Sequence, residues 1–208
     1  MLPPSLSPTI PSGPTGPPWE IAMLFPEQGD WTGEEYLEIS ERTNRVVELR
    51  DGRVEVQEMP GKTHQQIVIA FYTALKDFVR PGKIGEALVA PYPVKVSERT
   101  YREPDVVFML AENLARLGER FAEGADLVAE VISKDRKRDL VDKRGEYAEV
   151  GIAEYWLIDP RDQRITVLVL QNGQYLERGP FGPGQRADSA LLTGFGVGVD
   201  QILGLAQE

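Results

Sequence analysis

The chain has 208 residues, of which 41% are apolar, and its formal net charge is −10. This length suffices for one domain with a substantial core and is short for two. The sequence contains no cysteine, which excludes disulfides, thiolate zinc sites and cysteine nucleophiles and favours a reducing, cytoplasmic location. The acidic balance excludes tight DNA binding through the general surface, so a nucleic-acid contact requires a local basic patch, a metal ion or a symmetric dimer.

The N-terminal segment differs in composition from the rest of the chain. Residues 1–18 are rich in Pro, Ser and Gly and carry no charge, which predicts an arm without a packed element and a single domain over residues 19–208. No apolar run approaches the roughly 20 residues that span a bilayer, and the N-terminus lacks the pattern of a signal peptide. We therefore expect a soluble protein with no membrane partner.

The first predicted elements are a short helix and a hairpin. Thr32 is followed three residues later by Glu35, a capping-box pattern that predicts a helix start. Two alternating runs then flank Asp51-Gly52, which is a strong signal for a β-hairpin. The first strand of this hairpin carries Glu48.

A long amphipathic helix is predicted next, over residues 62–80. Its first turn contains His64, the only histidine, and Pro81-Gly82 is expected to end it. The apolar residues of one helical stripe are Ile67, Phe71, Ala74, Leu75 and Phe78.

The remaining pattern alternates strands with two further helical segments. Strand-like runs cover residues 83–90, 92–97, 104–110, 126–132, 154–159, 164–170 and 174–179, the last two joined at Asn172-Gly173. Helical patterns cover residues 111–124 and 136–151, the second ending at Gly151. The order predicts a mixed α/β sheet flanked by helices. Its central residues would be Val131, Ile132, Trp156, Leu157 and Ile158.

Two of the apolar strands each carry a carboxylate, Asp105 and Glu130. Burying a carboxylate without a partner costs several kcal/mol, so a cation, backbone donors or a divalent metal must compensate. Carboxylate oxygens are ligands that Mg²⁺ and Mn²⁺ prefer. Ile132 shares the strand face of Glu130 and cannot assist chemistry.

The helix that follows Glu130 offers three polar groups on one face. Asp139, Lys143 and Tyr147 are spaced four residues apart, which places a carboxylate, an ammonium and a phenol together. That face could point back over the strand ends. The alternative is an exposed ion pair between Asp139 and Lys143, worth only about 0.2–0.5 kcal/mol.

These segments carry a family resemblance. "PDVVF", "DLVAEVIS" and "RDLVDKRGEYAEVGIAEYWLIDP" resemble the Uma-two family of restriction-endonuclease-like proteins, a branch of the PD-(D/E)xK nuclease superfamily. The upstream runs "VVELRDGRVEVQEM" and "GKTHQQIVIAF" fit the same family, so the resemblance covers roughly residues 30–195. It implies a restriction-endonuclease-like mixed β-sheet core with flanking helices and an N-terminal β-hairpin extension.

The resemblance also implies an activity and assigns residues to it. Asp105 is implied as the Asp of the PD motif, Glu130 as the acidic residue of the (D/E)xK motif, and Lys143 as a lysine relocated from the position that Ile132 occupies. The implied function is metal-dependent hydrolysis of DNA phosphodiester bonds, with Asp105 and Glu130 holding Mg²⁺ or Mn²⁺. Lys143 would orient water or stabilise negative charge, and Glu48 would be an outer or second-metal ligand. A homodimer is also implied.

Other candidates have both a functional and a structural interpretation. His64 could contact substrate phosphate or a ligand carboxylate, or could be structural. Ser133 could cap the chain or hydrogen-bond Glu130. Residues 134–138, "KDRKR", are either a solvated loop or a phosphate-binding segment. Tyr155 and Trp156 are expected to pack in the core.

Two alternatives to a nuclease remain open from the sequence. The first is a binding module of the same fold that keeps the carboxylates and cuts nothing, which the acidic charge and Ile132 favour. The second is a glycosidase that uses Asp105 and Glu130 as acid and base, which requires an aromatic-lined cleft and leaves Lys143 without a role.

Overall fold

The main sheet of the protein has six strands. The computed structural model describes residues 28–204, so the arm predicted for residues 1–18 lies outside the described part of the chain. The strands are β3 (Gly85–Val89), β6 (Val106–Leu110), β7 (Leu127–Val131), β8 (Glu154–Asp159), β9 (Arg164–Gln171) and β10 (Gln174–Phe181). Their order is β10-β9-β8-β7-β6-β3, in which β7 and β8 run parallel and the other neighbours antiparallel. The predicted mixed α/β sheet is therefore confirmed.

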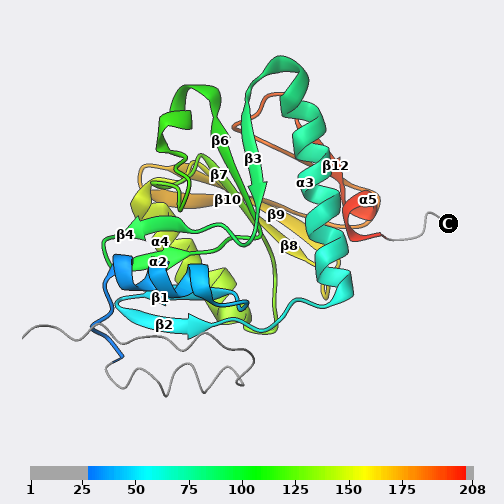
Figure 1. Cartoon of the computed structure of the whole chain (residues 1–208). Coiled ribbons are helices and arrows are strands. Elements are labelled where there is room, and N and C mark those ends of the chain that lie inside the picture. Colours follow the sequence, from blue (N-terminus) through cyan, green and yellow to red (C-terminus); the bar gives the residue numbers. More distant parts are fainter. Residues whose placement is uncertain (1–27, 205–208) are drawn as a thin grey trace, which may run out of the picture.

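A second sheet of four strands lies beside the main sheet (Figure 1). It comprises β1 (Val47–Arg50), β2 (Arg53–Val56), β4 (Val94–Ser97) and β5 (Thr100–Arg102), in the order β2-β1-β5-β4. The predicted hairpin at Asp51-Gly52 is confirmed as β1 and β2. The strand-like run predicted over residues 92–97 contains β4, which pairs with β5 because residues 98–99 reverse the chain between them. The three residues of β5 were too few to be recognised.

The helices begin and end largely where the sequence predicts. Helix α2 (Gly33–Arg42) starts with the predicted capping box, and α3 (Lys62–Gly82) extends through Pro81, ending where Lys83 adopts a left-handed conformation. Helix α4 (Lys143–Val150) ends at Gly151 as predicted, but the residues before it in the helix predicted over 136–151 include a π-helical turn, η2 (Arg138–Asp142).

Two parts of the chain differ from the prediction. The helix expected over residues 111–124 is only a short 3₁₀ helix, η1 (Ala111–Arg116), because Leu117 and Ala122 then pair as an antiparallel bridge. Near the C-terminus, β11 (Arg186–Asp188), β12 (Gly196–Gly198) and α5 (Val199–Leu203) had not been predicted. Each is too short to give a recognisable periodicity.

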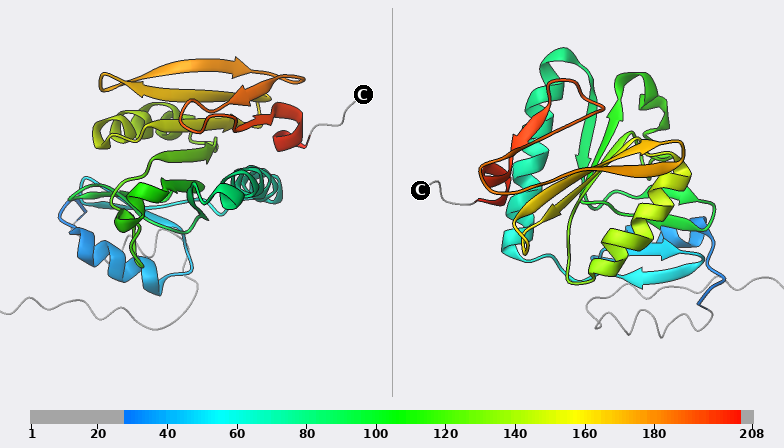
Figure 2. Two further views of the ribbon diagram at one scale, coloured as in Figure 1. Left: turned by 90° about the horizontal axis from the view of Figure 1, so that it is seen from above. Right: turned by 180° about the vertical axis from the view of Figure 1, so that it is seen from behind.

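Apolar side chains fill both faces of the main sheet. Helices α3 and α5 cover one face and α4 covers the other (Figure 2). On the first face Phe71 packs on Trp156, and on the second Tyr147 packs on Tyr155. Tyr155 and Trp156 are fully buried core residues, as predicted. Ile132 lies just beyond β7, and its N–H donates to the carbonyl of Ile158. Within residues 28–204, no helix has the length and apolar character needed to cross a membrane.

Candidate active site

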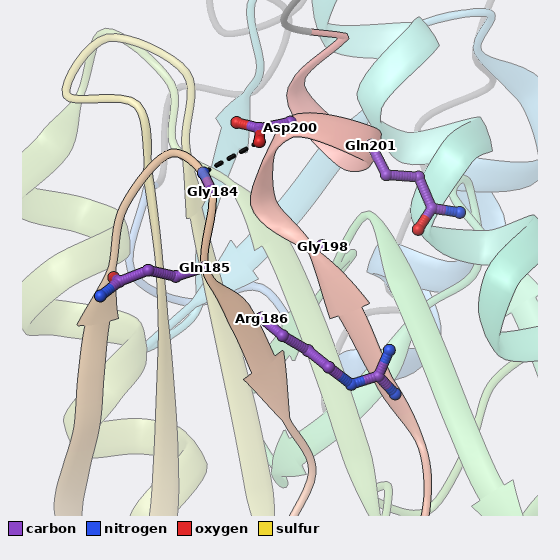
Figure 3. Close-up of a pocket in the computed structure, with 6 residues that line it drawn as sticks. All are labelled: Gly184, Gln185, Arg186, Gly198, Asp200 and Gln201. Atoms are coloured by element: carbon purple, nitrogen blue, oxygen red, sulfur yellow. Dashed lines mark hydrogen bonds between the residues drawn. The ribbon is translucent and has the colours of Figure 1, made fainter. Parts of the chain in front are cut away.

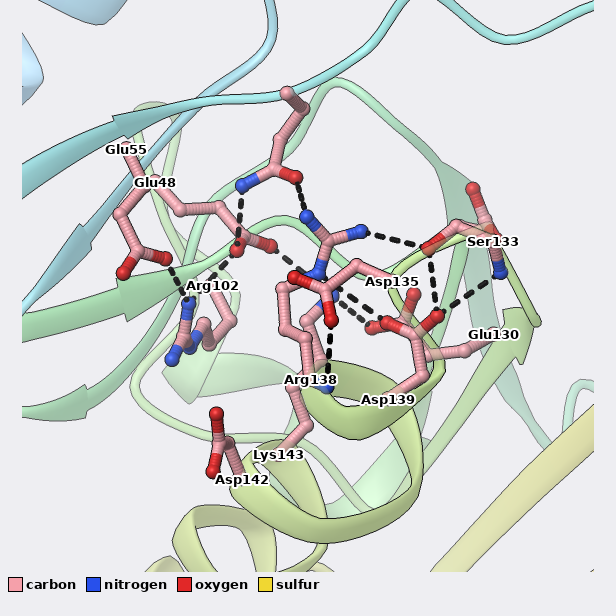
Figure 4. Close-up of polar contacts among 12 residues, drawn as sticks. Glu48, Glu55, Arg102, Glu130, Ser133, Asp135, Arg138, Asp139, Asp142 and Lys143 are labelled. Atoms are coloured by element: carbon pink, nitrogen blue, oxygen red, sulfur yellow. Dashed lines mark hydrogen bonds and ion pairs between the residues drawn. The ribbon is translucent and has the colours of Figure 1, made fainter.

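Glu130 and Lys143 meet where β7 faces the start of α4. The Lys143 ammonium lies 2.6 Å from Glu130 Oε1 (Figure 4). The Tyr147 hydroxyl donates to the same oxygen at 2.9 Å. Lys143 and Tyr147 share a helix face because they are four residues apart. All three side chains are buried. The predicted convergence of the helix face on the strand therefore exists for the ammonium and the phenol.

Glu48 reaches the same ammonium from β1. Its Oε1 lies 3.0 Å from Lys143 Nζ and accepts the N–H of Glu103 at 3.1 Å. Its Oε2 accepts from Arg102 Nη1 at 2.8 Å and from Gln57 at 3.1 Å. Burial acts to raise the pKa of Glu48, but the charges of Lys143 and Arg102 outweigh it and lower the pKa to about 2. Because both oxygens of Glu48 are occupied, its contacts favour a role in holding Lys143. They do not favour the metal-ligand role expected from the sequence.

Asp105 lies beside Glu130, directly before the neighbouring strand β6. The register of β6 and β7 pairs Val106 with Ala129, so its continuation places Asp105 opposite Glu130. Asp105 Oδ2 accepts the N–H of Val131 at 2.7 Å and lies 3.3 Å from His64 Nε2. His64 thus contacts a predicted ligand carboxylate, one of the two functional roles considered for it.

Asp105 and Glu130 each keep one oxygen without a hydrogen bond to residues 28–204. Every contact of Asp105 uses Oδ2, and every contact of Glu130 uses Oε1. Burial raises the pKa of Glu130 to about 8, and the neighbouring Asp105, Asp139 and Glu48 add to this rise against the charge of Lys143. Asp105 and Glu130 can therefore each bind a further donor or cation through the open oxygen.

This pair fits a hard divalent cation with few protein ligands. Within residues 28–204, no group of three or more His, Cys, Asp or Glu side chains is arranged to hold a metal ion. Mg²⁺ commonly uses one or two carboxylates and completes its shell with water and substrate phosphate oxygens. The open oxygens of Asp105 and Glu130 match that requirement, whereas a closed all-protein cage does not exist in the described part of the chain.

Ser133 and Asp139 form a separate contact behind the site. The N–H and hydroxyl of Ser133 both donate to Asp139 Oδ2 at 2.9 Å, so Ser133 does not bond Glu130 as one interpretation expected. Asp139 is buried and pairs with Arg138 at 3.3 Å, so the alternative of an exposed pair with Lys143 is wrong. The π-helical turn accounts for the difference because it changes the spacing between Asp139 and Lys143.

The basic segment 134–138 is neither uniformly solvated nor free. Lys134 is 88% exposed and pairs with Glu58, whereas Arg136 binds Asp159 with two nitrogens, at 2.7 and 3.1 Å. Arg138 points inward to Asp139. Both arginines of the segment 134–138 therefore bind carboxylates of the protein.

Sequence reasoning missed the contribution of the small sheet. Arg102 is buried against Glu48, and the adjacent Glu103 is buried with its Oε1 accepting from the Tyr36 hydroxyl at 3.1 Å. Burial is the main cause that raises the pKa of Glu103 to about 7. The signal was present in the run "TYREPD", where two charges directly precede the PD motif, but β5 itself was not recognised.

His64 is also an unusual group electrostatically. Its burial acts to lower the pKa, but the hydrogen bond and charge of Asp105 outweigh burial and raise it. Its Nδ1 is buried and has no hydrogen-bond partner among the described residues. Nε2 of the imidazole therefore faces Asp105, whereas Nδ1 is buried in the protein.

Two pockets of the molecule lie away from these carboxylates. One, of about 340 Å³, is lined by Gly184, Gln185, Arg186, Gly198, Asp200 and Gln201 (Figure 3). Asp200 there accepts the N–H of Gly184 at 2.9 Å. A second, of about 480 Å³, lies beside Trp31 and Tyr101. Neither shares a residue with the site of Asp105, Glu130 and Lys143.

Comparisons with known proteins identify the family and the fold of the chain. Residues 33–200 match the Uma2 family, described as "Putative restriction endonuclease". The chain belongs to the Uma-two family. A crystal structure described as a putative nuclease from Anabaena variabilis has a TM-score of 0.70 and 19% sequence identity, covering 83% of this chain and 97% of its own. No curated protein matches the chain. The predicted family and fold class are thus confirmed.

Proposed function

We propose that this Uma-two protein is a metal-dependent endonuclease that hydrolyses DNA phosphodiester bonds. The observation that carries the proposal is the pair Asp105 and Glu130, which lie opposite each other at adjacent strands and keep one open oxygen each, with the buried Lys143 ammonium 2.6 Å from Glu130. Family membership and the nuclease named as a structural neighbour support the same reaction class. The site residues are those that the resemblance implied.

Asp105 and Glu130 would hold Mg²⁺ or Mn²⁺ through Oδ1 and Oε2. Such an ion, when bound, polarises a phosphoryl oxygen and lowers the pKa of its bound water from about 15.7 toward 7. The protein orients these two oxygens through the other oxygen of each carboxylate. The N–H of Val131 and His64 Nε2 fix Asp105, and the Tyr147 hydroxyl fixes Glu130.

Lys143 serves as a cation in this proposal and not as a base. Burial acts to lower its pKa, but Glu130 and Glu48 outweigh burial and raise it well above the usual range. An ammonium has three N–H donors, and two of them point to Glu130 and Glu48. The third remains to stabilise negative charge that develops on a phosphate.

The proposal also includes how DNA is attracted, a homodimer and a cytoplasmic location. The net charge of −10 disfavours a broad DNA-binding surface, so metal at the carboxylates and the pairing of two copies would supply the attraction. A homodimer places two centres on one duplex, which cutting both strands requires. The absence of cysteine favours action in the reducing cytoplasm.

One observation favours a second candidate, a binding module of the same fold that cuts nothing. Glu48 and Lys143 are fully buried and neutralise each other within a network that includes Arg102, and such a network can be structural. A glycosidase is disfavoured because Tyr147, Tyr155 and Trp156 are buried in the core and line no sugar cleft. The two remaining candidates differ in whether a metal activates the site.

Cleavage of supercoiled and branched DNA with Mg²⁺ or Mn²⁺ tests the proposal. Asp105→Asn and Lys143→Ala should each abolish metal-dependent nicking while circular dichroism shows a folded chain. Glu177→Gln is the matched control because Glu177 is an exposed carboxylate of β10 outside the site. If the wild type nicks no DNA and calorimetry detects no Mn²⁺ binding, the binding module replaces the nuclease.

A further inference from the structure

Arg102 is a buried cation at the junction of three structural elements. Its side chain is 0% exposed and lies at the end of β5 (Figure 4). Toward the hairpin, Nη1 contacts Glu48 Oε2 at 2.8 Å and Glu55 Oε2 at 3.2 Å. Toward α4, Nε and Nη2 bind both oxygens of Glu146 at 2.7 and 2.8 Å. One guanidinium therefore joins both strands of the hairpin to the helix.

Both sets of contacts lead to Lys143. Glu48 lies 3.0 Å from the Lys143 ammonium through the oxygen that Arg102 does not use. Glu146 is three residues after Lys143 on α4, so its bond to Arg102 fixes the helix turn that carries the lysine. Arg102 thus holds Glu48, which pairs with the Lys143 ammonium, and also the helix turn that carries Lys143.

We propose that Arg102 is a positioning residue that sets the location of the Lys143 ammonium between Glu48 and Glu130. The inference rests on the proposed nuclease function for its kinetic consequence but not for its geometry. Lysine cannot replace Arg102 here, because a planar fork is needed to bind Glu146 with two nitrogens and Glu48 with a third. Arg102 does not contact the open oxygens of Asp105 or Glu130, so its effect on catalysis passes through Lys143.

A purely structural role makes a different prediction. If Arg102 only tied the small sheet to α4, its replacement would lower thermal stability and leave Lys143 in place in the molecules that remain folded. If Arg102 positions Lys143, the ammonium moves in the folded protein. The accessibility of Lys143 to an acetylating reagent, measured by mass spectrometry, separates the two and needs no nuclease activity.

The test compares Arg102→Lys with the wild type well below the melting temperature of both. Lys143 should be protected in the wild type and acetylated at least 10-fold faster in Arg102→Lys. With supercoiled DNA and Mn²⁺, kcat should fall roughly 10- to 100-fold, because a small displacement of a catalytic group has effects of that size. KM should stay within about twofold, since Arg102 is buried away from the surface.

Arg50→Lys is the matched control. Arg50 also binds this helical segment, through Asp142 of η2 at 3.0 Å and Glu146 of α4 at 3.7 Å, but it is 36% exposed and makes no contact with Glu48. It should leave both the protection of Lys143 and kcat at wild-type values. Equal acetylation of Lys143 in the Arg50 and Arg102 variants would show general loosening of the helix and would overturn the proposal.

A second variant covers the case in which Arg102→Lys does not fold. Glu146→Gln keeps the volume of Glu146 but removes the charge that draws Arg102 to α4, and should also expose Lys143 to acetylation. Protection of Lys143 in the folded variants, or an unchanged kcat in an active one, overturns the proposal. A wild type that cleaves no DNA refutes the nuclease function alone, and the acetylation result still decides the role of Arg102.

Discussion

The parallel strands β7 and β8 contain the buried carboxylates Glu130 and Glu154, which are held in different ways. Glu154 at the start of β8 accepts four hydrogen bonds, all from neutral donors: Trp156 Nε1, Ser189 Oγ and the N–H groups of Ala190 and Leu191. Glu130 near the end of β7 has contacts on one oxygen alone, from Lys143 and Tyr147. The exposed fractions are 0% for Glu154 and 5% for Glu130.

The two carboxylates differ in how completely their burial is compensated. Burial costs several kcal/mol unless hydrogen bonds or charges compensate, and Glu154 receives that compensation in full from fixed dipoles. Glu130 is compensated incompletely, which is why its pKa rises to about 8. The unused acceptor capacity beside Asp105 is what a cation would complete.

Substitution by Gln at Glu130 and at Glu154 should give the clearest contrast between the two carboxylates. Glu130→Gln should have the largest effect on cleavage. Replacing a proposed metal ligand by a neutral amide should reduce metal-dependent cleavage on the order of 10³-fold, as loss of a key electrostatic group does elsewhere. Stability should change by no more than about 1 kcal/mol, because Lys143 keeps Glu48 as its partner. Plasmid nicking and urea unfolding measure the two effects. Wild-type nicking in a folded variant would remove Glu130 from the mechanism.

Glu154→Gln should show the opposite profile. An amide places an NH₂ group against two donors in either orientation, so it should cost roughly 2–4 kcal/mol of unfolding free energy. Cleavage at a temperature where the variant is folded should stay within about twofold of the wild type, because Glu154 makes no contact with Asp105, Glu130 or Lys143. A loss of Mn²⁺ affinity comparable to that of Glu130→Gln would contradict the distinction between the two carboxylates.

Glu48 provides a third case, in which charged partners replace neutral donors. Its pKa is lowered from the usual 4.5 to about 2 mainly because Lys143 and Arg102 outweigh burial, a difference worth roughly 3 kcal/mol. A lowered carboxyl pKa stabilises the fold above about pH 4.5, and this contribution is lost as the pH falls through 2. The stability gap between wild type and Glu48→Gln should therefore be largest at pH 6 and close toward pH 2 in urea titrations. A gap independent of pH would contradict the role of the charge.

The sequence was informative where a pattern is long or chemically distinctive. The stripe of α3, the capping box at Thr32 and the hairpin at Asp51-Gly52 all appear as predicted, because each depends on neighbouring residues alone. The pairing of Lys143 with Glu130 followed from the family motif, and helical spacing added Tyr147.

What the sequence did not reveal depends on contacts between distant segments. Arg102 meets Glu48 across 54 positions and Glu146 across 44, and no local periodicity marks either partner. One of two interpretations paired Ser133 with Glu130 because it directly follows the strand, but Ser133 donates to Asp139 at the π-helical turn. The burial of Glu154 could not be predicted from the sequence, because three of its donors come from residues 189–191, far along the chain.

Ser189→Ala should have the smallest effect and isolates one donor of the structural carboxylate. The Ser189 hydroxyl donates to Glu154 Oε1 at 2.7 Å and accepts the N–H of Leu192 at 2.8 Å. Trp156 Nε1 still donates to the same oxygen after the change, so the expected cost is about 1 kcal/mol rather than the full price of an unpaired carboxylate. Metal-dependent cleavage should be unchanged. A cost equal to that of Glu154→Gln in urea unfolding would mean that the neutral donors act as one cooperative unit, in which no single hydrogen bond of Glu154 can be lost without losing the rest.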